Sequence, residues 1–99
     1  MYSHLVIFWT DPAQPNAVEQ LIAGAERLLQ PIPEIVFFHV GRMISSPRPV
    51  VDSTYQVGLN VVFATREARA DYKQHPLHSE FEATILKPLC QRHVVYDFE

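Results

Sequence analysis

Residues 54–63 read TYQVGLNVVF, and this stretch decides the fold. Large apolar side chains occupy every second position, and most positions between them are polar or small. A period of two is typical of a β-strand that buries one face. The alternating apolar set is Tyr55, Val57, Leu59, Val61 and Phe63. We predict that this set faces a layer of helices.

The rest of the chain divides around that strand at its prolines and glycines. Strand patterns occupy residues 2–9, 35–43, 54–63 and 93–98. Helical patterns occupy residues 16–30, 65–74 and about 79–86. The order β-α-β-β-α-β predicts an α+β, ferredoxin-like antiparallel sheet with its helices on one face. At 99 residues the chain forms one domain, residues 1–99, and the usual strand order places the first strand between the third and the last.

Both faces of this sheet carry apolar side chains, yet two helices cover only one. In the first strand His4, Val6 and Phe8 share the helix-side face. The opposite face receives Leu5, Ile7, Trp9, Val94, Tyr96 and Phe98. An apolar patch of this size marks an association surface, so we predict a homodimer that stacks sheet on sheet and buries Trp9 with Tyr96 or Phe98.

Composition excludes several partners. The net charge is −3 and the lysines and arginines are scattered, so neither nucleic acid nor a membrane surface is expected as a partner. Only three glycines occur and none forms a phosphate-binding loop, so no nucleotide cofactor is expected. The single Cys90 predicts a buried structural thiol in a reducing compartment. No basic, apolar leader opens the chain, and these features favour the cytoplasm.

Residues 72–78, YKQHPLH, are the sharpest chemical feature. Pro76 interrupts the helix and redirects the chain, so that Tyr72 and His78 can approach the sheet from two sides. A buried phenol and an imidazole there could polarise and deprotonate a carbonyl compound. A core tyrosine and a helix-capping histidine give the same pattern. His75 and His78 also have a spacing used in zinc sites, but Pro76 separates them and no cysteine joins, so we predict no metal.

His4 and Asp97 form a second feature. Alternation places both on the helix-side face of adjacent antiparallel strands, within hydrogen-bond distance of one another. A carboxylate there would orient the imidazole and raise its basicity. The alternative is a purely structural pair at the barrel mouth.

The chain resembles the stress-responsive dimeric α/β-barrel domain family over almost its whole length. The resemblance rests on Ser3-His4-Leu5-Val6, Gly41, the Tyr-x-x-His-Pro-x-His run and Tyr96-Asp97-Phe98. It implies a ferredoxin-like fold and a homodimer whose two sheets form a barrel.

One plant branch, the olivetolic acid cyclases, is enzymatic and similar in layout. Its members close a linear poly-β-keto thioester by aldol condensation without a cofactor. The resemblance carries their catalytic tyrosine and histidine onto Tyr72 and His78, and their supporting residues onto His4 and Asp97. A further pocket histidine of those enzymes is Val57 here, which implies a more apolar pocket and a different substrate.

These features support one functional hypothesis, a homodimer that binds a small apolar or keto-bearing molecule between sheet and helices. Its enzymatic form is a cofactor-independent, cyclase-like lyase with His78 as general base and Tyr72 as donor to the enolate. His4 and Asp97 hold the polar end. The predicted apolar lining is Val6, Leu21, Val57, Leu59 and Val61. Two alternatives stay open: a non-catalytic, stress-associated binding or structural dimer, and a cofactor-free monooxygenase of a related dimeric barrel.

Overall fold

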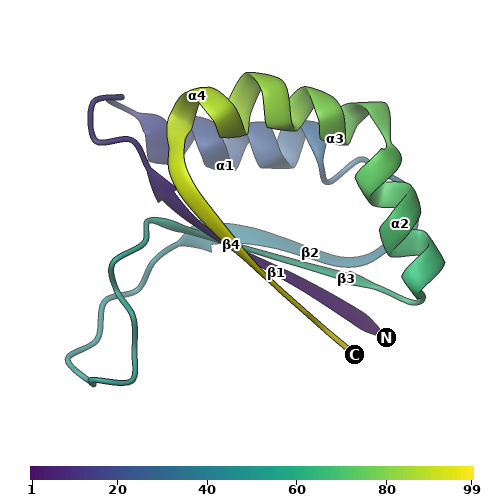
Figure 1. The fold of residues 1–99 in the computed structure, drawn as a ribbon, viewed down its shortest axis with the longest axis horizontal. Coiled ribbons are helices and arrows are strands. Elements are labelled where there is room, and N and C mark those ends of the chain that lie inside the picture. The colour runs from purple at the N-terminus through teal and green to yellow at the C-terminus, as the bar shows by residue number, and fades with distance from the viewer.

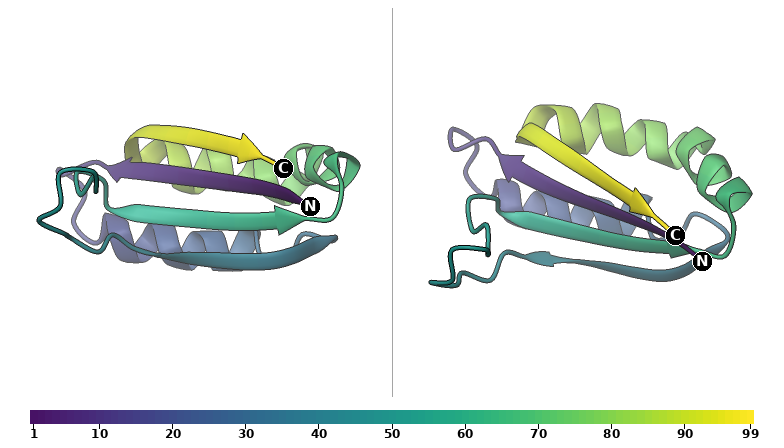
Figure 2. Two further views of the ribbon diagram at one scale, coloured as in Figure 1. Left: turned by 90° about the horizontal axis from the view of Figure 1, so that it is seen from below. Right: turned by 60° about the horizontal axis from the view of Figure 1, so that its bottom comes forward.

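Four antiparallel strands form one sheet in the order β2-β3-β1-β4, as seen in the computed structural model of residues 1–99 (Figures 1 and 2). The strands are β1 (Tyr2–Thr10), β2 (Ile35–Arg42), β3 (Val57–Phe63) and β4 (Cys90–Phe98). The helices are α1 (Ala17–Leu28), α2 (Arg66–Gln74), α3 (Pro76–Phe81), the π-helical segment η1 (Glu82–Leu86) and α4 (Lys87–Leu89). The ferredoxin-like order and the central position of β1 are both confirmed.

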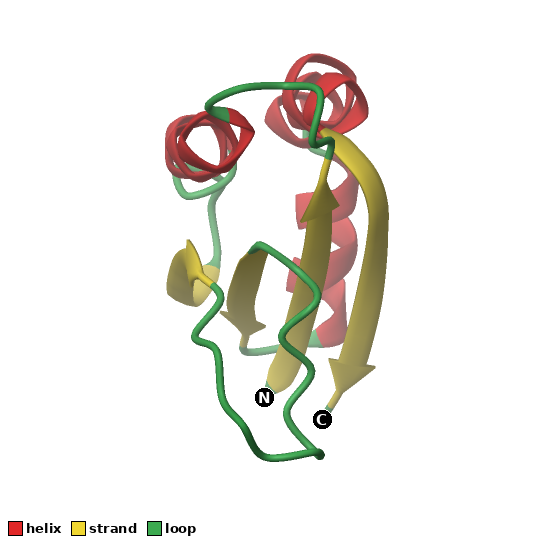
Figure 3. Ribbon diagram, turned by 90° about the vertical axis from the view of Figure 1, so that its left-hand side faces the viewer, coloured by secondary structure: helices red, strands yellow, loops and turns green.

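All helices lie on one side of the sheet (Figure 3). Helix α1 lies over β2 and β3, whereas the continuous stretch from α3 to α4 lies over β1 and β4 (Figure 2). The stretch from α3 to α4 packs sideways against α1. None of these helices has the length and apolar character needed to cross a lipid bilayer.

The strand pairing confirms the predicted faces. Along the β1–β4 ladder His4 lies opposite Asp97 and Phe8 opposite His93 on the helix side, while Ile7 lies opposite Val94 on the other side. The helix-side residues of β3 are completely or almost completely buried. They are Val57, Leu59, Val61 and Phe63.

Three elements begin about three residues away from the predicted position, and one of them matters for the site. Strand β4 begins at Cys90 rather than at residue 93. Strand β3 begins at Val57 rather than at residue 54, and the side chain of Gln56, just before it, accepts a hydrogen bond from the Thr10 amide. Helix α3 begins at Pro76, not near Ser79. Proline has no N–H and a fixed φ, so the first helical position tolerates it well. His75 caps this helix by accepting a hydrogen bond from the Leu77 amide. His78 therefore lies within the first turn of α3 rather than before it.

The face of the sheet opposite the helices is uncovered and largely apolar. Phe37, Tyr96 and Phe98 are each more than half exposed there. Trp9 is partly covered by its own chain, since Arg92 stacks 4.2 Å from its ring centre and its indole N–H donates to Thr54.

Candidate functional site

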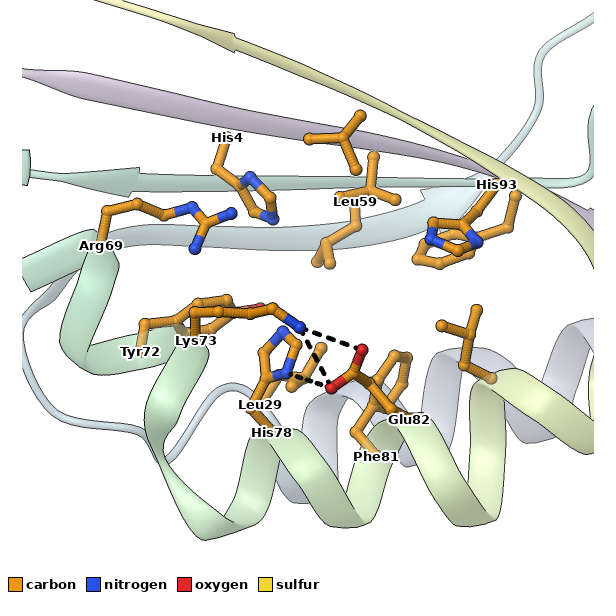
Figure 4. Close-up of a pocket in the computed structure, with 14 residues that line it drawn as sticks. His4, Leu29, Leu59, Arg69, Tyr72, Lys73, His78, Phe81, Glu82 and His93 are labelled. Carbon is orange, nitrogen blue, oxygen red and sulfur yellow. Dashed lines mark hydrogen bonds and ion pairs between the residues drawn. The ribbon is translucent and has the colours of Figure 1, made fainter.

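A cavity of about 200 Å³ lies between the helices and the β1–β4 side of the sheet (Figure 4). Its apolar wall includes Val6, Phe8, Leu59, Phe81, Leu86 and Val95. Its polar wall includes His4, Arg69, Tyr72, Lys73, His78 and Glu82. Strands β1, β3 and β4 form one side of this space, and α2, α3 and η1 supply the groups that face them.

His4 lies at the sheet side of the cavity, almost fully buried. Its Nδ1 is 2.6 Å from Oδ1 of Asp97, which confirms the predicted pair. Burial lowers the pKa of His4, and this effect outweighs the nearby Asp97 carboxylate, which acts in the opposite direction. The imidazole is therefore neutral at pH 7. Its Nδ1–H donates to Asp97, which leaves Nε2 as an acceptor facing the cavity.

Tyr72 lies next to His4 on the helix side of the cavity and is 1% exposed. Its ring packs edge-on against three others, with centres 5.9 Å from His4, 5.1 Å from Phe63 and 4.9 Å from His78. Helical spacing places Tyr72 and Ala68 on the same buried face of α2. No protein group bonds to its hydroxyl, and burial raises the pKa of Tyr72 well above its ordinary value of 10. The phenol thus stays protonated and is free to donate a hydrogen bond to a ligand.

His78 projects from the first turn of α3 toward Tyr72 (Figure 4). Its Nδ1 is 3.2 Å from Oε1 of Glu82, one helical turn later, and its other ring nitrogen faces the cavity. Burial lowers the pKa of His78, although Glu82 acts in the opposite direction. A neutral imidazole held at Nδ1 by a carboxylate has Nε2 available to accept a proton.

Glu82 and Lys73 are site residues that the sequence reasoning missed. Nζ of Lys73 lies 3.1 Å from Oε2 of Glu82, so one carboxylate holds both the lysine and His78. Burial raises the pKa of Glu82, but the hydrogen bond and positive charge of Lys73 and the hydrogen bond from His78 outweigh this effect, so the pKa is lowered. Glu82 opens the π-helical segment, and such segments are frequent at functional sites. The i, i+4 spacing of His78 and Glu82 is the signal that could have identified this pair.

Of the predicted site residues, the structure brings five to the cavity wall: His4, Val6, Leu59, Tyr72 and His78. Asp97 lies behind His4 and holds it, without lining the wall. Leu21, Val57 and Val61 are placed elsewhere, in the closed core, and none of them reaches the cavity. The reason is that α1 packs directly on β3 and fills the space beside those residues.

No group of three or more His, Cys, Asp or Glu side chains gathers in a way that could hold a metal ion. His75, the partner of His78 in the spacing considered above, uses its Nδ1 to cap α3. Cys90 is half-buried rather than fully buried, and burial raises the pKa of its thiol to about 11. The thiol is therefore protonated at pH 7 and is a poor nucleophile.

A four-stranded antiparallel sheet with the element order β-α-β-β-α-β and one helical layer defines the ferredoxin-like class of domain. The chain belongs to the stress-responsive A/B barrel domain family, whose model matches residues 3–99.

Three relatives show the range of proteins that this chain resembles. It is 30% identical over 98 residues to the stress-response A/B barrel domain-containing protein HS1 of Arabidopsis thaliana, covering 96% of this chain and 84% of that protein. A dimeric ferredoxin-like protein from Thermobifida fusca superposes with a TM-score of 0.79 at 22% identity, covering 98% and 88% of the two chains. A hydroxynitrile lyase from Passiflora edulis does so with a TM-score of 0.80 at 18% identity, covering 98% and 90%. The likeness to these two structures shows the shared fold.

Proposed function

We propose that this protein is a homodimer that binds a small keto-bearing molecule in the cavity and performs cofactor-free acid–base chemistry on it. The observation that carries the proposal is the convergence of Tyr72, His78 and His4 on one cavity. Burial leaves the tyrosine as a donor and both imidazoles neutral. Enolisation requires a protonated group that donates a hydrogen bond to the carbonyl oxygen and a neutral base that accepts the proton from carbon. These side chains have the protonation states for both roles.

In the proposed reaction Nε2 of His78 removes a proton from the carbon next to the ketone. The C–H bond breaks, its electrons form the enolate, and the Tyr72 hydroxyl donates a hydrogen bond to the oxygen that gains charge. Glu82 stabilises the imidazolium that forms, because its carboxylate lies 3.2 Å from Nδ1. The enolate carbon then bonds to a second carbonyl carbon, whose π electrons move to its own oxygen, and this oxygen takes the proton from His78. Without a second carbonyl, the enolate carbon takes the proton back. His4 accepts a hydrogen bond from a polar group of the ligand.

Cavity size limits the substrate. A volume of about 200 Å³ is below the usual range of roughly 300–1,000 Å³ for drug-sized ligands. A compact aromatic ketone fits a cavity of this volume better than a long polyketide does. The expectation that Val57 makes this pocket more apolar is not met, because Val57 does not line the cavity.

The test of this chemistry is hydrogen exchange in a simple ketone. The probe is 4-oxo-4-phenylbutanamide in D₂O, and proton NMR follows loss of the methylene signal next to the ketone. We expect the protein to accelerate this exchange at catalytic concentration. Binding of the amide without exchange would favour the non-catalytic binding alternative, and absence of both would refute the proposal.

The homodimer is proposed from the uncovered apolar face, with support from the dimeric state of the Thermobifida fusca structure. Light scattering at micromolar concentration should give twice the mass of 11.4 kDa. Ile7→Asp should give monomers or insoluble protein, because an unpaired charge in a dry interface is costly. Ile44→Asp is the matched control, since Ile44 is 83% exposed in a loop. A wild-type mass of one chain would contradict the dimer.

A cytoplasmic location remains part of the proposal, resting on the lone free thiol.

A further inference from the structure

We infer that the ligand is a small keto acid, whose carboxylate binds Arg69 while its ketone lies between Tyr72 and His78. This inference rests on the proposed function, because it names the substrate class of the same cavity. Arg69 was not among the residues that the sequence identified, and no step of the proposed reaction uses it.

The guanidinium of Arg69 is an unsatisfied donor group. It projects from α2 to the end of the cavity beside His4 and Tyr72 (Figure 4). Its side chain is only 18% exposed, yet it makes no hydrogen bond to the protein, and its Nε has neither a partner nor contact with solvent. A guanidinium has five N–H donors in a fixed fork that matches a carboxylate.

The nearest carboxylate does not meet this need. Oδ2 of Asp97 is 3.9 Å from a terminal nitrogen of Arg69, beyond hydrogen-bond distance, and the other oxygen of Asp97 is held by His4 at 2.6 Å. Arg69 therefore has an opposite charge nearby but no bonded acceptor.

The charges on the cavity wall leave Arg69 as the cation available to a ligand. The other charged side chains of the wall are Lys73 and Glu82, and these two pair with each other. The next cation along the same face of α2 is Arg66, which is mostly exposed and pairs with Glu99. An anion entering the cavity would thus meet one cation that lacks a hydrogen-bonded carboxylate, at the end where His4 lies.

The spacing fits a carboxylate a few bonds from the ketone. The guanidinium carbon of Arg69 is 6.0 Å from the centre of the Tyr72 ring, and His78 packs 4.9 Å from that centre. A carboxylate bonded to the guanidinium would therefore leave the ketone within reach of the Tyr72 hydroxyl and its acidic carbon near His78.

The experiment compares two probes of nearly the same size and shape, the anion 4-oxo-4-phenylbutanoate and its neutral amide, by calorimetric binding and by methylene exchange. The wild type should bind the carboxylate on the order of 10- to 100-fold more tightly, the usual range for a hydrogen bond to a charged group. Arg69→Gln should remove this preference and leave the amide within about 2-fold, while Arg69→Lys should retain part of it. Arg66→Gln is the matched control, which removes one positive charge from the same helix and should retain the preference.

The outcomes separate this inference from the proposed chemistry. Equal binding of acid and amide by the wild type would overturn the inference without any variant, and so would an Arg69→Gln protein that weakens both probes alike, as a structural arginine would. A third probe, 4-phenylbutanoate, has the carboxylate but no ketone. Arg69-dependent binding of this probe without exchange of any ketone would support the anion site and refute the chemistry.

Discussion

The space between the helices and the sheet has two halves, and they differ in how completely side chains fill them. Over β2 and β3, α1 packs directly on the sheet, and Leu21, Val57 and Val61 have no exposed surface. Over β1 and β4, the stretch from α3 to α4 packs sideways on α1 and leaves the cavity below it. Val95 on β4 faces this open half and remains 43% exposed. We call these regions the filled half and the open half.

The difference shows that one hydrophobic layer can serve two purposes. Apolar residues of the filled half gain stability by close packing, and a void there would be costly. The open half accepts incomplete packing and places a tyrosine, three histidines and an arginine around the space that remains. The predictions below test whether stability resides in the first half and chemistry in the second.

The largest expected effect is on chemistry in the open half. His78→Ala should slow methylene exchange in 4-oxo-4-phenylbutanamide by roughly 10²–10⁴-fold, the usual loss for a general base, with little change in melting temperature. His75→Ala is the matched control, because His75 caps α3 but does not line the cavity. An unchanged exchange rate in His78→Ala would contradict the claim that the open half carries out the chemistry.

The second effect is on stability. Leu21→Ala removes a fully buried side chain of the filled half and should cost about 2–5 kcal/mol of unfolding free energy, lowering the melting temperature by about 10 °C or more. Leu86→Ala makes the same change on the cavity wall, where the side chain is only partly buried, and should cost about 1 kcal/mol. Thermal unfolding of both variants checks this, and equal losses would contradict the contrast.

Tyr72→Phe should have a smaller effect on the exchange rate than His78→Ala, on the order of 10-fold, because it removes one donor and preserves the ring packing. The melting temperature should stay the same or rise slightly, since the deleted hydroxyl has no protein partner. A marked loss of stability would instead show that the hydroxyl has a structural role.

The smallest effect is a pH dependence of stability. Burial lowers the pKa of His4 and of His78 below 6.5, so between the lowered values and pH 6.5 the unfolded chain binds more protons than the folded one. Stability should therefore be full above pH 6.5 and fall as the pH falls through that window. Denaturant unfolding at a series of pH values should show a shallower decline for His78→Ala. A wild-type protein that becomes more stable as the pH falls from 6.5 would contradict these shifts.

Alternation in the sequence is sufficient to predict which face each strand residue occupies. Together with the strand order usual for a β-α-β-β-α-β chain, it predicts the His4–Asp97 pair. It could not predict the two halves, because whether a helix lies directly over a given strand depends on packing between distant elements. For that reason Leu21, Val57 and Val61 were expected on the cavity wall, whereas Arg69 and Glu82 were overlooked. The position of Glu82 on the cavity wall also depends on the π-helical segment that it opens. Such a segment departs from the helical period that sequence patterns assume.

The most direct test of the open half as a ligand site is methyl NMR of the protein titrated with 4-oxo-4-phenylbutanoate. Val94 and Val95 are adjacent in β4 but point to opposite faces, and Val57 marks the filled half. We predict that the methyl signals of Val95 shift as the probe binds, while those of Val94 and Val57 do not. Shifts at Val94 or Val57 with none at Val95 would contradict the assignment of the ligand site to the open half.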